Sequence, residues 1–265
     1  MSTPEKLLAS RSGLVVAPAG CGKTRLLVDT VIAAPGGRTL VLTHTRAGVA
    51  VIKARLTSVK PSQFRVATLD NWCSWLACGL PGLSKFVPTG TGADYDAAKR
   101  ASLRVLKSDA VRQALAVTYD RVLVDEYQDC GKLQHEIIVQ LKSALPAIAF
   151  GDHMQHVFDF NDDGTPAWLD VCASFEDRWD LDTPWRWNQV NEHEFGEWVL
   201  RQRSVLEAGG QVDFRSGPPN IRWRPLPPDG DLHRRFHLDS LPKPTELCLN
   251  LGDAVIRRRF VLACW

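Results

Sequence analysis

Short apolar segments alternate with longer amphipathic ones over the first 150 residues of this 265-residue chain. The apolar runs have the length of buried strands, and the amphipathic stretches have the spacing of helices. This alternation predicts a parallel sheet covered by helices on both faces. The expected strands are Leu14–Ala17, Thr39–Thr43, Arg65–Thr68, Tyr119–Val124 and Ala147–Phe150, and the expected helices are Lys23–Ala34, Arg46–Leu56, Asp70–Ala77, Tyr95–Val117 and Lys132–Leu145.

The pattern changes at two places along the chain. Gly79–Asp94 is rich in Gly, Pro and Thr and is expected to be a surface loop. Beyond Asp152 the periodicity weakens, and Trp168–Trp187 holds four tryptophans among many acidic residues. Val190–Glu207 is then expected to be helical, and Pro244–Leu251 to form one more strand.

The composition of the chain does not indicate a binding partner, but it does suggest a cellular location. The net charge is only +2, so a basic binding surface would have to be a local groove rather than a field over the whole protein. The seven cysteines include no C-x-x-C pair, and the N-terminus lacks the apolar core of a signal peptide. We therefore expect reduced thiols and a cytoplasmic location.

The segment APAGCGKT, residues 17–24, lies between an expected strand and an expected helix, which is the context of a phosphate-binding P-loop. Gly20 and Gly22 allow the backbone N–H groups to face an anion at the helix N-terminus. Lys23 is expected to reach the β- and γ-phosphates of ATP, and the hydroxyl of Thr24 to bind Mg²⁺. The first position holds Ala17 where the strict pattern has glycine. The expected nucleotide contacts are Ala17, Ala19, Gly20, Cys21, Gly22, Lys23, Thr24 and Arg25.

A second acidic element, VLVDEYQD, ends another apolar strand. Neighbouring residues on a strand point to opposite faces, so Asp125 and Glu126 can perform different tasks. We expect Asp125 to hold Mg²⁺ and Glu126 to deprotonate the attacking water. Two solvated acids at the end of a strand are the plain alternative.

An ordered series of motifs resembles the UvrD/Rep-like superfamily 1 DNA helicases. After APAGCGKT come TLVLTHTRAGVAVIKARL, RVATLDNWCSWL, DEYQD, FGDHMQHVFDF and LDTPWRWN, which together extend over residues 14 to 190. The resemblance implies a RecA-like P-loop ATPase that acts on single-stranded DNA, with RNA left open. It also implies that Gln155 senses the γ-phosphate and that Arg186 is an arginine finger, although a surface ion pair is the alternative for Arg186.

The same resemblance implies residues that contact nucleic acid. Thr43 and Thr45 would contact phosphates, while His44 would contact either DNA or its own loop. The aromatic candidates for base stacking have core packing as their alternative role. These candidates are Trp72, Phe158 and Phe160.

Departures from the family pattern set the expected domain organisation. No glutamine precedes Ala17 to recognise adenine, and the insertion around residues 79–117 is short. The motifs of a complete second motor domain are not found. We therefore expect a RecA-like ATP-binding domain at residues 1–180 and a partial, incomplete second RecA-like domain at residues 181–265.

Three functional hypotheses follow from these observations. The first is a DNA-dependent, helicase-like ATPase. The second is a truncated, non-translocating ATP-binding module that regulates or completes a partner protein, which would supply or replace the missing motor domain. The third is another P-loop class such as a small-molecule kinase, which the DEYQD and GD-x-x-Q elements disfavour.

Overall fold

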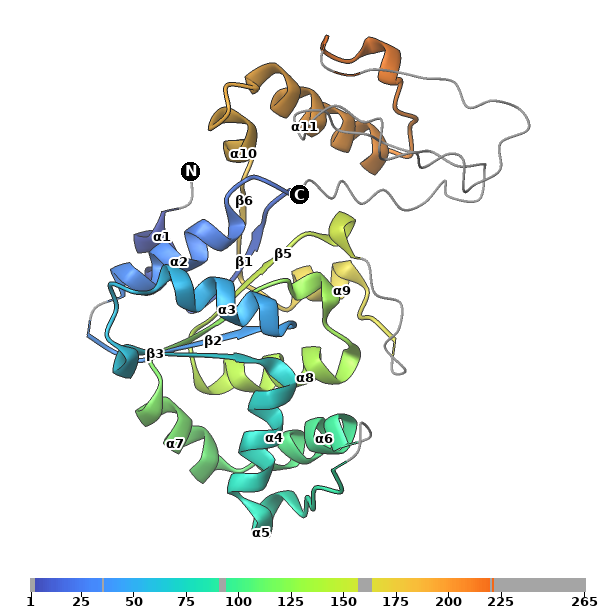
Figure 1. Cartoon of the computed structure of the whole chain (residues 1–265). Helices are drawn as coiled ribbons and strands as arrows, with labels where there is room; N and C mark the ends of the chain where they lie inside the picture. Colours follow the sequence, from blue (N-terminus) through green and yellow to red (C-terminus); the bar gives the residue numbers. More distant parts are fainter. Residues whose placement is uncertain (1–2, 35, 91–93, 157–163, 220, 222–265) are drawn as a thin grey trace. The chain divides into compact units, whose positions relative to one another are not determined.

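The expected strands lie side by side in a sheet whose neighbouring strands all run parallel (Figure 1). The computed structural model describes residues 3–34, 36–90, 94–156, 164–219 and 221. Within them the strand order is β3-β2-β4-β5-β1-β6. The strands are β1 (Ser12–Val16), β2 (Thr39–Thr43), β3 (Phe64–Thr68), β4 (Arg121–Val124), β5 (Ala147–Gly151) and β6 (Asp177–Asp180).

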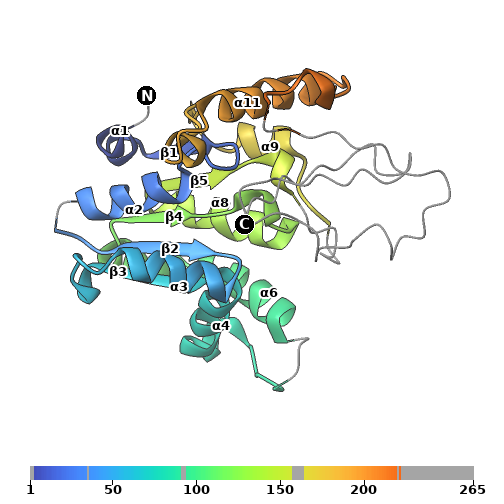
Figure 2. The ribbon, with the colours of Figure 1, turned by 45° about the horizontal axis from the view of Figure 1, so that its top comes forward.

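Helices cover both faces of this sheet, as the apolar pattern predicted (Figures 1 and 2). The central strands alternate: Leu40 and Leu42 belong to one buried cluster, and Val41 between them belongs to the other. Because both faces are buried, these strands have almost no polar residues. One face packs on α1 (Pro4–Ala9), α2 (Lys23–Ala33) and α3 (Arg46–Arg55), and the other on α4 (Leu69–Gly79), α6 (Asp94–Leu106), α7 (Asp109–Thr118) and α8 (Lys132–Ala144).

Threonines define two of the turns from strand to helix. Thr45 accepts a 2.9 Å hydrogen bond from the backbone N–H of Gly48 and caps α3. Thr68 accepts one of 3.2 Å from Asn71 and caps α4. A threonine in extended conformation at this position satisfies a helical N–H that would otherwise have no acceptor. Both helices therefore begin within one residue of the expected positions.

The structure corrects two expectations about secondary structure and adds two elements that were not predicted. The expected helix Tyr95–Val117 is two helices, α6 and α7, because the chain turns at Ser108. The expected loop Gly79–Asp94 contains a short helix, α5 (Pro81–Ser84). The acidic, tryptophan-containing segment contributes α9 (Trp168–Ala173) and the edge strand β6, which sequence periodicity did not reveal.

The chain divides into two compact units after Asp182, and the sheet belongs to the first. The described part of the second unit contains α10 (Trp185–Asn188), α11 (His193–Glu207) and the short 3₁₀ helix Phe214–Ser216. Its core is a cluster of Trp187, Phe195, Trp198 and Val199. The expected strand Pro244–Leu251 lies outside the described residues.

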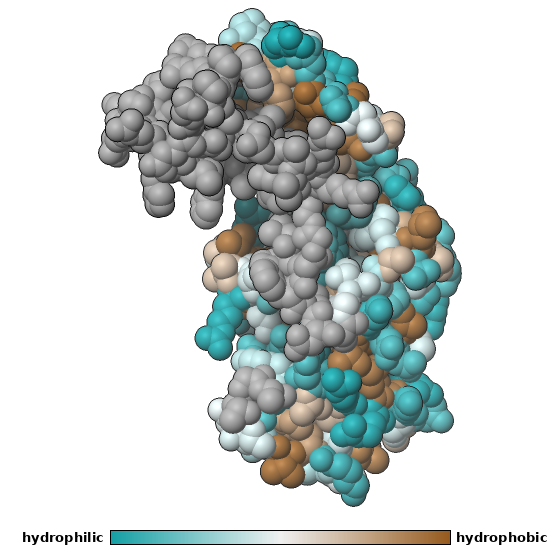
Figure 3. Space-filling model, turned by 90° about the vertical axis from the view of Figure 1, so that its right-hand side faces the viewer, coloured by the Kyte–Doolittle hydropathy of each residue, from teal (hydrophilic) through white to brown (hydrophobic). Residues whose placement is uncertain are grey.

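The described surface mixes polar and apolar residues. On the face shown in Figure 3, hydrophobic residues are scattered among hydrophilic ones. Within the described residues, no helix combines the length and apolar character needed to cross a bilayer.

Candidate nucleotide-binding and catalytic site

The expected phosphate loop connects the end of β1 to the start of α2. Gly20 and Gly22 have φ angles of +77° and +88°, a left-handed conformation that favours glycine. Gly22 is also the N-cap of α2, and no side chain caps the helix there. The first N–H groups of an eleven-residue helix therefore begin at this loop, as a bound anion requires.

The side chains of the loop differ in what they offer a nucleotide. Cys21 is buried, so it would contribute through its backbone. Lys23 is only 8% exposed, and its Nζ contacts Oε2 of Glu126. In contrast, Arg25 is exposed and pairs along α2 with Asp29, with 2.9 Å between its Nε and the carboxylate. The structure thus directs Lys23 inward, whereas the side chain of Arg25 lies along the helix surface. The remaining expected contacts Ala17, Ala19, Gly20, Gly22 and Thr24 line the same loop or begin its helix.

Two adjacent carboxylates follow β4 and lie in different environments. Asp125 is buried, and burial raises the pKa of its carboxyl to about 6 despite the nearby Lys23 ammonium. Glu126 is partly exposed and adopts a left-handed backbone with φ of +55°. Burial alone would raise the pKa of Glu126, but the charge and hydrogen bond of Lys23, with help from Gln128, lower it. Glu126 thus combines a left-handed backbone with a side chain that contacts Lys23 of the phosphate loop.

The oxygen atoms near this carboxylate pair suit a magnesium ion. Mg²⁺ prefers hard oxygen ligands and typically takes one or two from the protein and others from substrate phosphates and water. The raised pKa of Asp125 indicates a buried carboxylate without sufficient positive charge around it. Thr24 makes no hydrogen bond through its hydroxyl within the described part of the chain. Thr24 and Asp125 are therefore the residues that could hold Mg²⁺, and this assignment stays a prediction.

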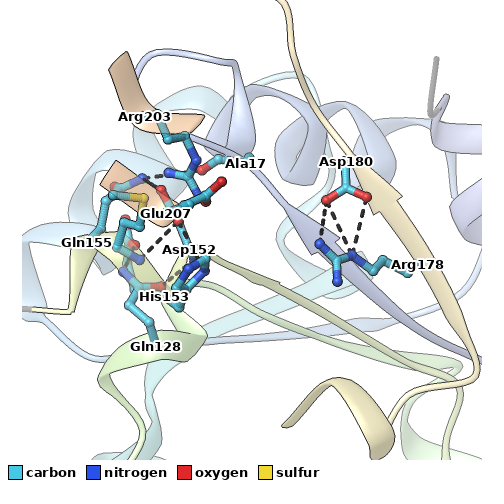
Figure 4. A network of polar contacts seen from close by, with 11 residues as sticks. Ala17, Gln128, Asp152, His153, Gln155, Arg178, Asp180, Arg203 and Glu207 are labelled. Atoms are coloured by element: carbon cyan, nitrogen blue, oxygen red, sulfur yellow. Dashed lines mark hydrogen bonds and ion pairs between the residues drawn. The ribbon is translucent and has the colours of Figure 1, made fainter. Parts of the chain in front are cut away.

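The end of β5 contributes a third group of polar residues (Figure 4). Asp152 is fully buried and accepts a 2.6 Å hydrogen bond from Nε2 of Gln155. The same Nε2 lies 3.3 Å from the carbonyl oxygen of Ala17, at the start of the phosphate loop. Gln155 is thus in direct contact with the start of the phosphate loop, and its role as a sensor of the γ-phosphate stays a prediction.

A buried glutamine joins these groups, and sequence reasoning missed it. The Nε2 of Gln128 donates a 2.7 Å hydrogen bond to Oε2 of Glu126, and its Oε1 accepts one of 3.1 Å from the backbone N–H of Asp152. Gln128 lies in DEYQD, but this motif was interpreted only through its two acids. The available signal was a glutamine four positions after the end of a buried strand, within the same motif as the two acids.

Three of the residues expected to contact nucleic acid lie at the end of β2, and their side chains differ in how far they are exposed to a ligand. Thr43 is 2% exposed, so its hydroxyl offers little to a ligand. Thr45 is exposed, although its hydroxyl caps α3. His44 is half-buried with Nε2 3.3 Å from Sγ of Cys130, and burial lowers its pKa to about 4. His44 is therefore neutral at pH 7, and its side chain contacts the segment after the DEYQD motif. Its expected contact with DNA or with its own loop stays a prediction.

The remaining expected residues do not all fall in the first unit. Trp72 is fully buried in the core between α4 and the sheet, so no face of its ring is open to a base. We therefore do not retain the stacking role expected for Trp72, because the apolar environment of α4 buries the whole indole. Phe158 and Phe160 lie outside the described residues. Arg186 is exposed on α10 in the second unit.

Comparison with known proteins identifies a family segment in this chain. Residues 84–169 match the family described as the UvrD/REP helicase N-terminal domain. The matched segment contains Asp125, Glu126, Gln128 and Gln155, and the phosphate loop precedes it. An ATP-dependent helicase/nuclease subunit from Oenococcus oeni is 30% identical over 67 residues, which are 25% of this chain. The match spans only 6% of that relative's length.

Solved structures of a viral helicase are also similar to the chain. The crystal structure of Arterivirus nonstructural protein 10 (helicase) is 18% identical, with a TM-score of 0.37, and the match covers 67% of this chain and 37% of that one. Its complex with DNA is 18% identical, with a TM-score of 0.40, and the match covers 81% of this chain and 44% of that one. The family match confirms the resemblance expected from the motifs for residues 84–169, which are similar to the UvrD/REP helicase N-terminal domain.

Proposed function

We propose that this chain is an ATPase of the superfamily 1 helicase type that couples ATP hydrolysis to single-stranded DNA. One observation carries the proposal: Lys23 of the phosphate loop and Glu126 of the DEYQD motif meet at the carboxyl edge of the sheet. A phosphate-binding lysine and a candidate base for water, brought together by different strands, suit phosphoryl transfer to water.

The proposed reaction begins with an exchange of partners at Lys23. The triphosphate draws the Lys23 ammonium away from Glu126, because several phosphate charges outcompete one carboxylate. Glu126 is then free to accept a proton from the attacking water. Mg²⁺, held by Thr24 and Asp125 when bound, supplies positive charge that offsets the developing charge on the phosphates.

Two further residues complete the proposed chemistry. Gln155, which contacts the carbonyl of Ala17, would report whether a γ-phosphate is present. Arg186 of α10 would stabilise negative charge on the transferring group as an arginine finger. We assign residues 1–180 to a RecA-like ATP-binding domain and residues 181–265 to part of a second motor domain.

Nucleic acid is the proposed activator of this ATPase. Thr45 is exposed after β2 and His44 is half-buried beside it, at the same sheet edge as the phosphate loop. Phe158 and Phe160 remain the proposed base-stacking residues, since aromatic stacking tolerates any base and suits a strand of any sequence. We propose DNA rather than RNA as the natural strand, and parallel assays with both polymers distinguish them.

Steady-state ATP hydrolysis by the purified chain, with and without single-stranded DNA, tests the proposal. We expect stimulation by DNA in the wild type. Lys23→Ala should lose both nucleotide binding and turnover, whereas Glu126→Gln should still bind ATP but lose roughly 10²- to 10⁴-fold in turnover, the usual contribution of a general base. Lys53→Ala, at an exposed position on α3, is the matched control and should behave like the wild type.

Two outcomes would contradict this function. Turnover at wild-type rate in both variants would refute the assigned roles of Lys23 and Glu126. Nucleotide binding without turnover, with or without DNA, would instead favour a non-translocating ATP-binding module whose ATP-bound form associates with a partner protein. A pull-down in the presence of ATP and of ADP would then identify that partner.

A further inference from the structure

Two side chains hold the same oxygen atom of the candidate base. Nζ of Lys23 and Nε2 of Gln128 both contact Oε2 of Glu126. Within the described residues, Oε1 of the same carboxylate accepts no hydrogen bond. The carboxylate is therefore fixed through one oxygen, and the other is available to a water molecule.

Gln128 is itself held rigidly. Its side chain is 5% exposed, and its Oε1 accepts the 3.1 Å hydrogen bond from the backbone N–H of Asp152. Its backbone carbonyl accepts a 2.8 Å hydrogen bond from Nδ1 of His156. A Cβ atom added to Gly151 would stand 3.1 Å from Oε1 of Gln128, so the strand passes close to the amide. A side chain fixed at both its amide oxygen and its backbone can orient a second group accurately.

These contacts form a chain of hydrogen bonds that connects the two ends of the phosphate loop. It runs from Lys23 to Glu126, from Glu126 to Gln128, and from Gln128 to Asp152. Asp152 then binds Gln155, whose amide reaches the carbonyl of Ala17 at the other end of the phosphate loop. Three strand ends, those of β1, β4 and β5, are linked in this way.

We propose that Gln128 is the positioning residue of the hydrolytic step. When ATP draws Lys23 away, Gln128 is the remaining group that holds Oε2 of Glu126, and Oε1 is left facing the attacking water. Because Gln128 also binds the segment that carries Gln155, occupation of the γ-phosphate position and orientation of the base are mechanically connected. This inference rests on the proposed ATPase function, and Gln128 itself neither takes nor gives the proton.

Two substitutions separate the contacts of Gln128. Gln128→Leu removes both side-chain hydrogen bonds, whereas Gln128→Glu keeps an oxygen for the N–H of Asp152 and loses the donor to Glu126. We expect both variants to lower kcat roughly 10- to 100-fold, the range in which supporting partners of active-site groups typically act. The Kd for ATP, measured by fluorescence with a labelled analogue in the presence of Mg²⁺, should stay within about twofold, since within the described residues Gln128 makes no hydrogen bond to the phosphate loop.

Gln134 provides a matched control in the same unit. It is also buried, and its side chain also makes two hydrogen bonds, from the N–H of Gly131 and to Asp70, each of 3.0 Å. Gln134→Leu should lower the melting temperature about as much as Gln128→Leu while leaving kcat near that of the wild type. The comparison distinguishes positioning from general loss of structure.

The possible results separate this inference from the function on which it rests. A wild-type chain that does not hydrolyse ATP with or without DNA would overturn both. If the wild type turns over and Gln128→Glu matches it, the positioning role alone is overturned. Equal losses of kcat in Gln128→Leu and Gln134→Leu, or a loss confined to ATP affinity, would also overturn it. A loss of kcat at unchanged ATP affinity, absent from Gln134→Leu, is the supporting result.

Discussion

Replacing Trp72 tests whether this residue stabilises the core or contacts DNA. Its side chain is fully buried in the cluster between α4 and the sheet. A buried aromatic side chain removes about 150–250 Å² from water, worth about 4–6 kcal/mol at about 25 cal/mol per Å². Alanine retains a small part of this area, so Trp72→Ala should cost about 3–5 kcal/mol in the free energy of unfolding. That is a large fraction of the roughly 5–15 kcal/mol that stabilises a typical protein.

Urea denaturation of the protein, monitored by circular dichroism, measures this loss in the free energy of unfolding. Trp72→Phe should cost less and remain folded, because its ring keeps most of the packing and the indole N–H has no hydrogen-bond partner among the described residues. The control is Trp75→Ala on the same helix, where the ring is 47% exposed and stacks on Arg65 with 3.8 Å between the guanidinium and the ring centroid. It should cost about 1 kcal/mol or less.

Affinity for single-stranded DNA decides between the two roles of Trp72. The folded Trp72→Phe variant should bind DNA as the wild type does. The reasoning is refuted if Trp72→Ala is nearly as stable as the wild type, or if Trp72→Phe keeps its stability and loses most of its DNA affinity. The first result would mean that the ring contributes little to the core, and the second that it contacts DNA.

Two further predictions concern pH and packing. Because burial lowers the pKa of His44 from 6.5 in the unfolded chain to about 4, its contribution to stability is complete above pH 6.5 and is lost as the pH falls toward 4. The stability difference between wild type and His44→Gln should therefore shrink by about 1–3 kcal/mol between pH 7 and 4.5; a constant difference in urea titrations would contradict this. Gly13→Ala should lower stability by about 1–3 kcal/mol, because its Cβ would stand 2.2 Å from Cζ3 of Trp179. The open position Gly79→Ala is the control, and equal melting temperatures for the two variants would show that β6 adjusts freely.

The central strands and the start of the phosphate-loop helix were predictable from local information. Thr39–Thr43 is a strand at the expected residues, because residues on both of its faces are apolar. Helix α2 begins at Lys23 as expected, because the preceding glycines permit the left-handed turn of the phosphate loop. By contrast, β6 carries exposed Asp177, Arg178 and Asp180, and Arg178 pairs with Asp180 (Figure 4). An edge strand that buries little beyond one indole has no apolar periodicity to detect.

In the candidate site, too, some features were predictable from the sequence and others depended on the tertiary structure. Residue types and their order in the sequence predicted which groups would carry the proposed chemistry: a lysine after a glycine turn, two acids after a buried strand and a glutamine after another. Only the tertiary structure decided that Lys23 and Gln128 share one oxygen of Glu126, and that Trp72 is enclosed by the core. Periodicity along one segment reports which face of that segment is apolar. The hydrogen-bond partner of a polar side chain depends instead on which strands lie next to each other in the sheet. Parallel pairing brings together strand ends that are distant in the sequence, such as those near Ala17 and Gln155, which are 138 positions apart.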